Sequence, residues 1–181
     1  MLSKAKHRGG GLCESDGHAM GVHSIFYIAF KGLAMSQRNG LVVIDLQFGF
    51  SPDADLVEGI RDVARDYAVV VATRFCSLPD SLFRHRLEEG HDGGAVIDVG
   101  HTLIIDKPGY GLDQSAITAL REFEVDEWGL VGSRTGACIM ACAFSLWDAG
   151  IPFHVLHALC AAEDGSLRDA TETILQRQFG L

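Results

Sequence analysis

The sequence predicts an α/β protein, a three-layer α/β/α sandwich around a central, mostly parallel sheet of the Rossmann-like kind. Five short apolar runs alternate with longer helical segments along the chain. The runs are continuous rather than alternating, which is typical of strands buried on both faces. The 181 residues, 48% hydrophobic and 22% charged, are enough for one globular domain with a substantial core.

The first predicted strand is the apolar run 41–44, which ends at Asp45. Four further runs have the same length and mostly apolar composition. They cover residues 69–72, 102–105, 128–131 and 153–156.

Helices are predicted between and after these strands, at residues 53–67, 80–88, 113–123, 136–147 and 166–178. In the first, Leu56 and Ile60 stand one helical turn apart, as on a buried helix face. The second follows Pro79, and the apolar fourth ends before Gly150. Ser166 suits the first turn of the last helix.

Residues 1–36 differ from the rest, because they contain three consecutive glycines and show no clear periodicity. We expect them to be a flexible or non-native N-terminal extension. The functional domain is then residues 37–181, with the functional protein beginning near Met35.

Composition disfavours several classes of partner. A net charge of −9 repels phosphate backbones, and no segment has the roughly 18 to 20 apolar residues of a membrane helix, so neither nucleic acid nor a membrane is expected. The five cysteines follow no secreted framework, which favours the reducing cytoplasm. A zinc site at Cys138, Cys142, His154 and His157 does not have a structural zinc spacing, so no metal is expected.

Candidate reactive groups follow the predicted strands, at the edge where ligands collect in parallel sheets. Asp45 ends the first strand, Arg74 and Phe75 follow the second, Lys107 follows the third, and residues 133–138 follow the fourth. We therefore expect a site at this edge.

Cys138 stands where a helix begins. The helix dipole and the free N–H groups there would lower the pKa of the thiol and hold an oxyanion, as a nucleophile requires. The alternative is a small buried helix residue, the role we expect for Cys142 one turn later. Asp45 is a candidate base or a loop cap, and Lys107 a stabilising cation or a surface lysine.

The combination of segments resembles the isochorismatase-like cysteine hydrolases. Residues 43–47 (VIDLQ) resemble the first strand and catalytic aspartate of that family, and 105–111 (IDKPGYG) its lysine segment. Residues 132–139 (GSRTGACI) resemble the nucleophile segment, and 148–153 the helix end and strand that follow. The resemblance covers about residues 41–180.

The resemblance implies a triad in which Asp45 takes the proton of Cys138 and Lys107 stabilises the charges. It implies a cis peptide at Ser133–Arg134 that turns the N–H groups of Arg134 and Cys138 toward the oxyanion. It also implies a homo-oligomer and no cofactor. Relatives acting on nicotinamide carry an Asp-x-His metal motif after the second strand, and residues 73–79 lack it, which disfavours a zinc nicotinamidase.

Five residues on this edge are expected to bind substrate, and Arg134 is a candidate for holding a substrate carboxylate. They are Gln47, Phe50, Phe75, Tyr110 and Arg134. The leading hypothesis is hydrolysis of a small amide or ureido compound through a Cys138 thioester. The alternatives are vinyl ether cleavage of the isochorismate type, using Asp45 and Lys107, and a non-catalytic protein that keeps the fold.

Overall fold

The computed structural model describes residues 38–86 and 93–180. Their centre is a parallel sheet with the strand order β3-β2-β1-β4-β5. The five strands lie where the apolar runs predict them, and most extend further. They are β1 (Asn39–Ile44), β2 (Val69–Phe75), β3 (Leu103–Lys107), β4 (Glu127–Gly132) and β5 (Phe153–Cys160). The extension proposed for residues 1–36 lies outside the described residues and stays a prediction.

The α-helices are α2 (Ala54–Ala64), α3 (Leu82–Arg86), α4 (Gln114–Arg121), α5 (Met140–Asp148) and α6 (Gly165–Phe179). Three of them begin after an aspartate whose carboxylate accepts a backbone N–H of the first turn, namely Asp53, Asp113 and Asp164. A short 3₁₀ turn, η1 (Phe48–Phe50), was not predicted. The helix predicted at 136–147 is divided into a π-helical turn, η2 (Thr135–Ile139), and α5.

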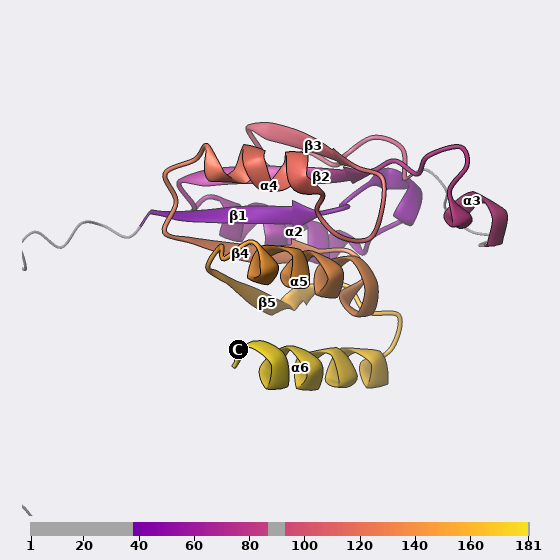
Figure 1. Cartoon of the computed structure of the whole chain (residues 1–181). Helices are drawn as coiled ribbons and strands as arrows, with labels where there is room; N and C mark the ends of the chain where they lie inside the picture. Colours follow the sequence, from indigo (N-terminus) through magenta and orange to yellow (C-terminus); the bar gives the residue numbers. More distant parts are fainter. Residues whose placement is uncertain (1–37, 87–92, 181) are drawn as a thin grey trace, which may run out of the picture. The chain divides into compact units, whose positions relative to one another are not determined.

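Helices cover both faces of the sheet and form the predicted three layers (Figure 1). On one face, α4 and α5 bury Leu120 and Leu146 in a core with Val42 and Leu130. On the other, α2 packs Ile60 in a second core, which holds strand residues such as Val43. Residues 41–44 of β1 are fully buried and all apolar, as the continuous run predicted.

No helix in the described part of the chain is both long and apolar enough to cross a lipid bilayer.

Candidate active site

The three predicted reactive residues converge at the carboxyl edge of the sheet. Asp45 follows β1, Lys107 is the last residue of β3, and Cys138 lies in η2, after β4. The Lys107 Nζ is 2.9 Å from the Asp45 Oδ2, and the two side chains are 0% and 2% exposed. To reach Asp45, Lys107 extends past the end of β2, where its Nζ is 5.4 Å from the centre of the Phe75 ring. The Cys138 thiol is close enough for the charges of both side chains to act on its pKa.

Asp45 is held by Thr73, a buried residue of β2. The Asp45 N–H donates to the Thr73 Oγ1 at 3.0 Å, and this hydroxyl donates to the Asp45 Oδ1 at 2.7 Å. The other carboxylate oxygen, Oδ2, is in ion contact with Lys107 but has no well-aligned hydrogen-bond donor within the described ranges. The backbone of Asp45 has φ 48°, a conformation that aspartate adopts more readily than most residues.

Lys107 is anchored by the loop that follows it. Its ammonium donates to the carbonyl oxygens of Gly109, at 2.6 Å, and Tyr110, at 2.9 Å. Burial by itself lowers the pKa of this lysine, but the negative charge of Asp45 outweighs burial, so the pKa is raised. Lys107 is therefore a cation in the folded protein.

The turn that carries Cys138 is tied to both neighbouring strands. The Ser133 N–H donates to the carbonyl of Ile44 at 2.8 Å, and the N–H and hydroxyl of Thr135 both donate to the carbonyl of Ala161. Gly132 has φ 121°, and a side chain there would collide with the Ile44 carbonyl, so the close approach of β4 to β1 requires glycine.

The cis peptide predicted at Ser133–Arg134 is wrong. Residues 38–86 and 93–180 contain no cis peptide bond. The chain instead reverses through positive φ angles at Gly132 and at Arg134, where φ is 64°. The Arg134 N–H has no acceptor among the described residues. Its use as an oxyanion donor stays a prediction, as does that of the Cys138 N–H.

The lowered pKa predicted for Cys138 is also wrong. Only 6% of this residue is exposed, and burial together with the charge of Asp45 raises the pKa of the thiol to about 12, against the opposing effect of Lys107. The free site therefore holds a protonated thiol next to a carboxylate. Cys142, predicted as a core residue, is fully buried, and its thiol contacts the Tyr110 carbonyl at 3.5 Å.

Gln47, two residues after Asp45, is fully buried. Its Nε2 donates to the carbonyls of Phe75 and Gly94, at 3.2 and 2.9 Å, and its Oε1 accepts the Phe75 N–H at 2.7 Å. The amide thus fixes the end of β2 to the segment around Gly94. Its predicted contact with substrate stays a prediction.

Aromatic rings form a continuous chain beside the site. Successive ring centres of Phe50, Phe75, Phe83 and Tyr110 are 6.2, 5.0 and 4.7 Å apart. All of these residues except Phe83 are predicted from the sequence. Phe83 lies on the five-residue helix α3, which is too short for a clear apolar periodicity. The Arg134 guanidinium lies 5.9 Å from the centre of the Phe50 ring, at the other end of the chain.

Arg134 also forms a loose ion pair with Glu163. The distance between its Nη1 and the Glu163 Oε1 is 3.5 Å, and the two side chains are 48% and 67% exposed. Such an exposed pair contributes little to stability, so the guanidinium is available to a ligand.

No three His, Cys, Asp or Glu side chains of the described chain gather as a metal-binding group. His154 contacts Glu127 at 3.0 Å, and His157 contacts Glu172 at 3.6 Å.

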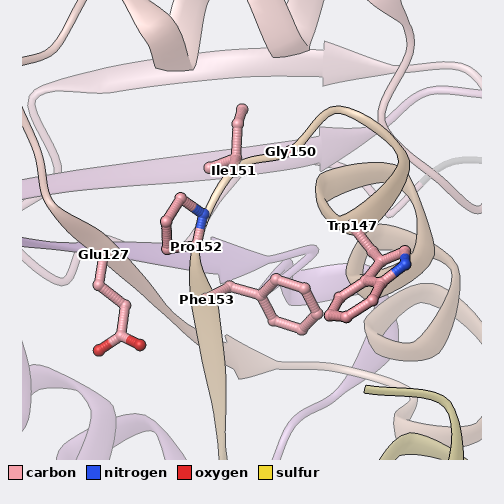
Figure 2. A pocket seen from close by; sticks show the side chains of 6 residues that line it. All are labelled: Glu127, Trp147, Gly150, Ile151, Pro152 and Phe153. Atoms are coloured by element: carbon pink, nitrogen blue, oxygen red, sulfur yellow. The ribbon is translucent and has the colours of Figure 1, made fainter. Parts of the chain in front are cut away.

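A separate pocket of about 360 Å³ lies at the amino edge of the sheet, where β4 and β5 begin. Figure 2 shows its lining residues, which do not include Asp45, Lys107 or Cys138. They are Glu127, Trp147, Gly150, Ile151, Pro152 and Phe153.

No protein-family model matches the sequence, and no curated protein matches it. Solved structures do resemble the fold. An isochorismatase-like hydrolase from Alkaliphilus metalliredigens has a TM-score of 0.66 and 15% identity over 77% of this chain and 91% of its own. N-carbamoylsarcosine amidase from Thermoplasma acidophilum has a TM-score of 0.64 and 22% identity, over 80% and 94%. A pyrazinamidase/nicotinamidase from Streptococcus mutans UA159 has a TM-score of 0.67 and 18% identity, over 78% and 97%.

Proposed function

We propose that this chain, which has the fold of isochorismatase-like hydrolases, is a cysteine hydrolase that cleaves an amide or ureido C–N bond of a small molecule. The observation that carries the proposal is the meeting of Asp45, Lys107 and Cys138 at one edge of the sheet, with the ammonium 2.9 Å from the carboxylate. The likeness to solved amidases agrees with this chemistry.

The first step is formation of a thioester. Because the free thiol has a pKa of about 12, its proton moves to Asp45 as the sulfur attacks the substrate carbonyl, without a standing thiolate. The carbonyl electrons move to oxygen, where the N–H groups of Arg134 and Cys138 are proposed to stabilise the negative charge. The C–N bond then breaks, and the amine or ammonia leaves with the proton from Asp45.

The second step is hydrolysis. Water gives a proton to Asp45 and attacks the thioester carbonyl, the C–S bond breaks, and the proton returns to sulfur as the acid leaves. Lys107 stays charged throughout and stabilises the carboxylate and the developing thiolate. Its two hydrogen bonds to the following loop keep it in place during these steps.

Substrate is proposed to bind against the aromatic chain, with Phe50, Phe75 and Tyr110 contacting a planar or apolar group. Arg134 would leave its loose ion pair with Glu163 and bind a carboxylate at the far end of the substrate. Gln47 holds the backbone of Phe75 through two hydrogen bonds and is proposed to line the site.

Assembly as a homo-oligomer and a cytoplasmic location are further parts of the proposal. The exposed Phe144 and Trp147 on α5 support assembly, because large apolar side chains on one helix face favour contact between copies. Sedimentation velocity showing only monomers would contradict the first part. Fractionation that finds the protein outside the cytoplasm would contradict the second.

One observation favours a second candidate, vinyl ether cleavage of the isochorismate type. The Asp45–Lys107 pair is complete without the thiol, and the raised pKa of Cys138 keeps that thiol protonated. In this reaction Asp45 and Lys107 would suffice, and Cys138 would only fill space.

Ammonia release from a panel of small amides and carbamoyl compounds tests the proposal, with isochorismate as a separate substrate. We expect Cys138→Ala to lose amide hydrolysis by about a thousandfold or more while the fold survives, because no other group can form the thioester. The matched control is Cys76→Ala, at an exposed cysteine. Full amide hydrolysis by Cys138→Ala would refute the thioester route. Retained isochorismate cleavage by that variant, lost in Asp45→Asn, would favour the second candidate.

A further inference from the structure

We infer that Thr73 is a positioning residue that decides which oxygen of Asp45 receives the thiol proton. The inference rests on the proposed function, because it concerns the proton that Cys138 must lose. It is carried by the two hydrogen bonds that one buried hydroxyl makes to a single residue.

The direction of both hydrogen bonds follows from the chemistry of a hydroxyl group. Thr73 Oγ1 has one hydrogen to donate and lone pairs to accept. The Asp45 N–H is a donor only, so the hydroxyl accepts from it, at 3.0 Å. Its own hydrogen then goes to the Asp45 Oδ1, at 2.7 Å.

The two carboxylate oxygens of Asp45 are therefore unequal. The Oδ1 is engaged by the Thr73 hydroxyl. The Oδ2 is 2.9 Å from the Lys107 Nζ but lacks an aligned donor in the described part of the chain, so it can still accept a proton. We assign the Oδ2 as the oxygen that takes the proton of Cys138.

Thr73 also holds Asp45 in an uncommon backbone conformation. Asp45 has φ 48°, which surrounding contacts must maintain in a residue other than glycine. Both the N–H and the carboxylate of Asp45 are tied to the same hydroxyl. Without it, the buried carboxylate could rotate and direct either oxygen toward the thiol.

The position of Thr73 in the sheet explains why a threonine serves well here. It lies in β2, directly after the pairing of Ala72 with Val43 of β1, so it reaches the end of that strand. A β-branched side chain in a strand has restricted χ1, which keeps the hydroxyl directed at Asp45.

The test measures how fast iodoacetamide alkylates Cys138, by mass spectrometry of the peptide that contains it. In this reaction the Cys138 proton moves to Asp45 while the sulfur bonds to the reagent carbon and iodide leaves. Thr73→Val keeps the shape but removes the hydroxyl, and we expect alkylation to slow about tenfold or more, because the carboxylate is no longer held in the orientation that receives the proton. Thr73→Ser should restore the rate to within about threefold of wild type, because serine keeps the hydroxyl.

The matched control is Thr171→Val in α6. Thr171 is 1% exposed, and its hydroxyl donates to the Leu167 carbonyl at 2.9 Å. This change removes an equally buried hydroxyl elsewhere and should leave Cys138 alkylation unchanged. If Thr73 only supported the fold, Thr73→Val and Thr171→Val would have the same effect on the rate of Cys138 alkylation.

Three outcomes separate the inference from the proposed function. Wild-type alkylation in Thr73→Val, together with slow alkylation in Asp45→Asn, overturns the inference alone. Alkylation of Asp45→Asn at or above the wild-type rate overturns the acid–base pairing of the proposed function. If Thr73→Val does not fold, Thr73→Cys replaces it, since a thiol is a weak donor, and a wild-type rate in that variant also overturns the inference.

Discussion

Two ion pairs that differ in burial involve neighbouring residues of β3. Asp106 pairs with Arg74 of β2 through two contacts of 2.6 and 2.8 Å, with side chains 58% and 43% exposed. Lys107, the next residue, pairs with Asp45 in the interior. Since side chains alternate along a strand, consecutive residues of β3 point to opposite faces.

The difference shows that close charges alone do not make a site. The exposed pair makes two hydrogen bonds, which hold the pKa of Asp106 below the usual value, yet water reaches both side chains and screens their charges. Both charges of the buried pair have lost their hydration, so removing either partner leaves an uncompensated buried charge and destabilises the folded protein. It is also the pair beside a thiol, where an unscreened charge can act on a reaction.

The largest expected effect comes from breaking the buried pair. Lys107→Met leaves the Asp45 carboxylate buried without its cation, and we expect the free energy of unfolding to fall by about 3–5 kcal/mol. Urea denaturation measures this loss. The double variant Asp45→Asn with Lys107→Met should recover much of it, because no unpaired charge remains. A single variant as stable as wild type would show that the pair is not buried in solution.

The next effect is a loss of stability in alkali, which involves buried groups and not the exposed pair. Burial raises the pKa of the Cys138 and Cys160 thiols to about 12, and the pKa of Lys107 is also raised. Groups with a raised folded pKa contribute stability that is present below the unfolded pKa, roughly 8.5 for a thiol, and is lost as pH rises to the folded value.

Melting curves between pH 8 and 11 test this expectation. Each thiol should contribute a decline of up to roughly 1.4 kcal/mol per pH unit. Cys138→Ser should show a shallower decline than wild type. Equal slopes would mean that this thiol is not shielded from water. The stability contributed by the exposed pair depends on pH in the opposite direction. Because the pKa of Asp106 is lowered in the folded protein, this contribution is lost as pH falls into the acid range.

The smallest effect comes from breaking the exposed pair. Asp106→Asn should lower the free energy of unfolding by about 0–1 kcal/mol, and 1 M NaCl should reduce the difference further. Because the Asp106 side chain faces away from Asp45, Cys138 alkylation should stay at the wild-type rate. A loss above about 2 kcal/mol would contradict the assignment of this pair as screened.

Most of the fold could be predicted from the sequence, because burial on both faces leaves strands with continuous apolar runs. Strand ends were harder to predict. The second strand was predicted to end at residue 72, but β2 continues to Phe75 and so contains Thr73. The hydroxyl that holds Asp45 was therefore missed. A β-branched residue directly after an apolar run is the signal that would have extended the strand.

The meeting of Asp45, Lys107 and Cys138 could also be predicted, since each lies at or after the end of a strand and the motif resemblance grouped them. The pKa of Cys138 could not, because it depends on how deeply the tertiary structure buries the thiol and on the nearby carboxylate. The turn before it was mispredicted because its path depends on contacts to Ile44 and Ala161, which are distant in sequence. The buried role of Gln47 likewise depends on its partners in other segments.

The side chains of Asp106 and Lys107 point to opposite faces of the sheet, and this limits where residues can be inserted or deleted in β3. If one residue were lost from the short strand β3, Lys107 would turn toward solvent and Asp106 toward the interior. Two carboxylates would then meet beside Cys138 with no cation between them. A one-residue deletion inside β3 should therefore abolish the buried ion pair, whereas length changes in surface loops that do not contact Lys107 should be tolerated better.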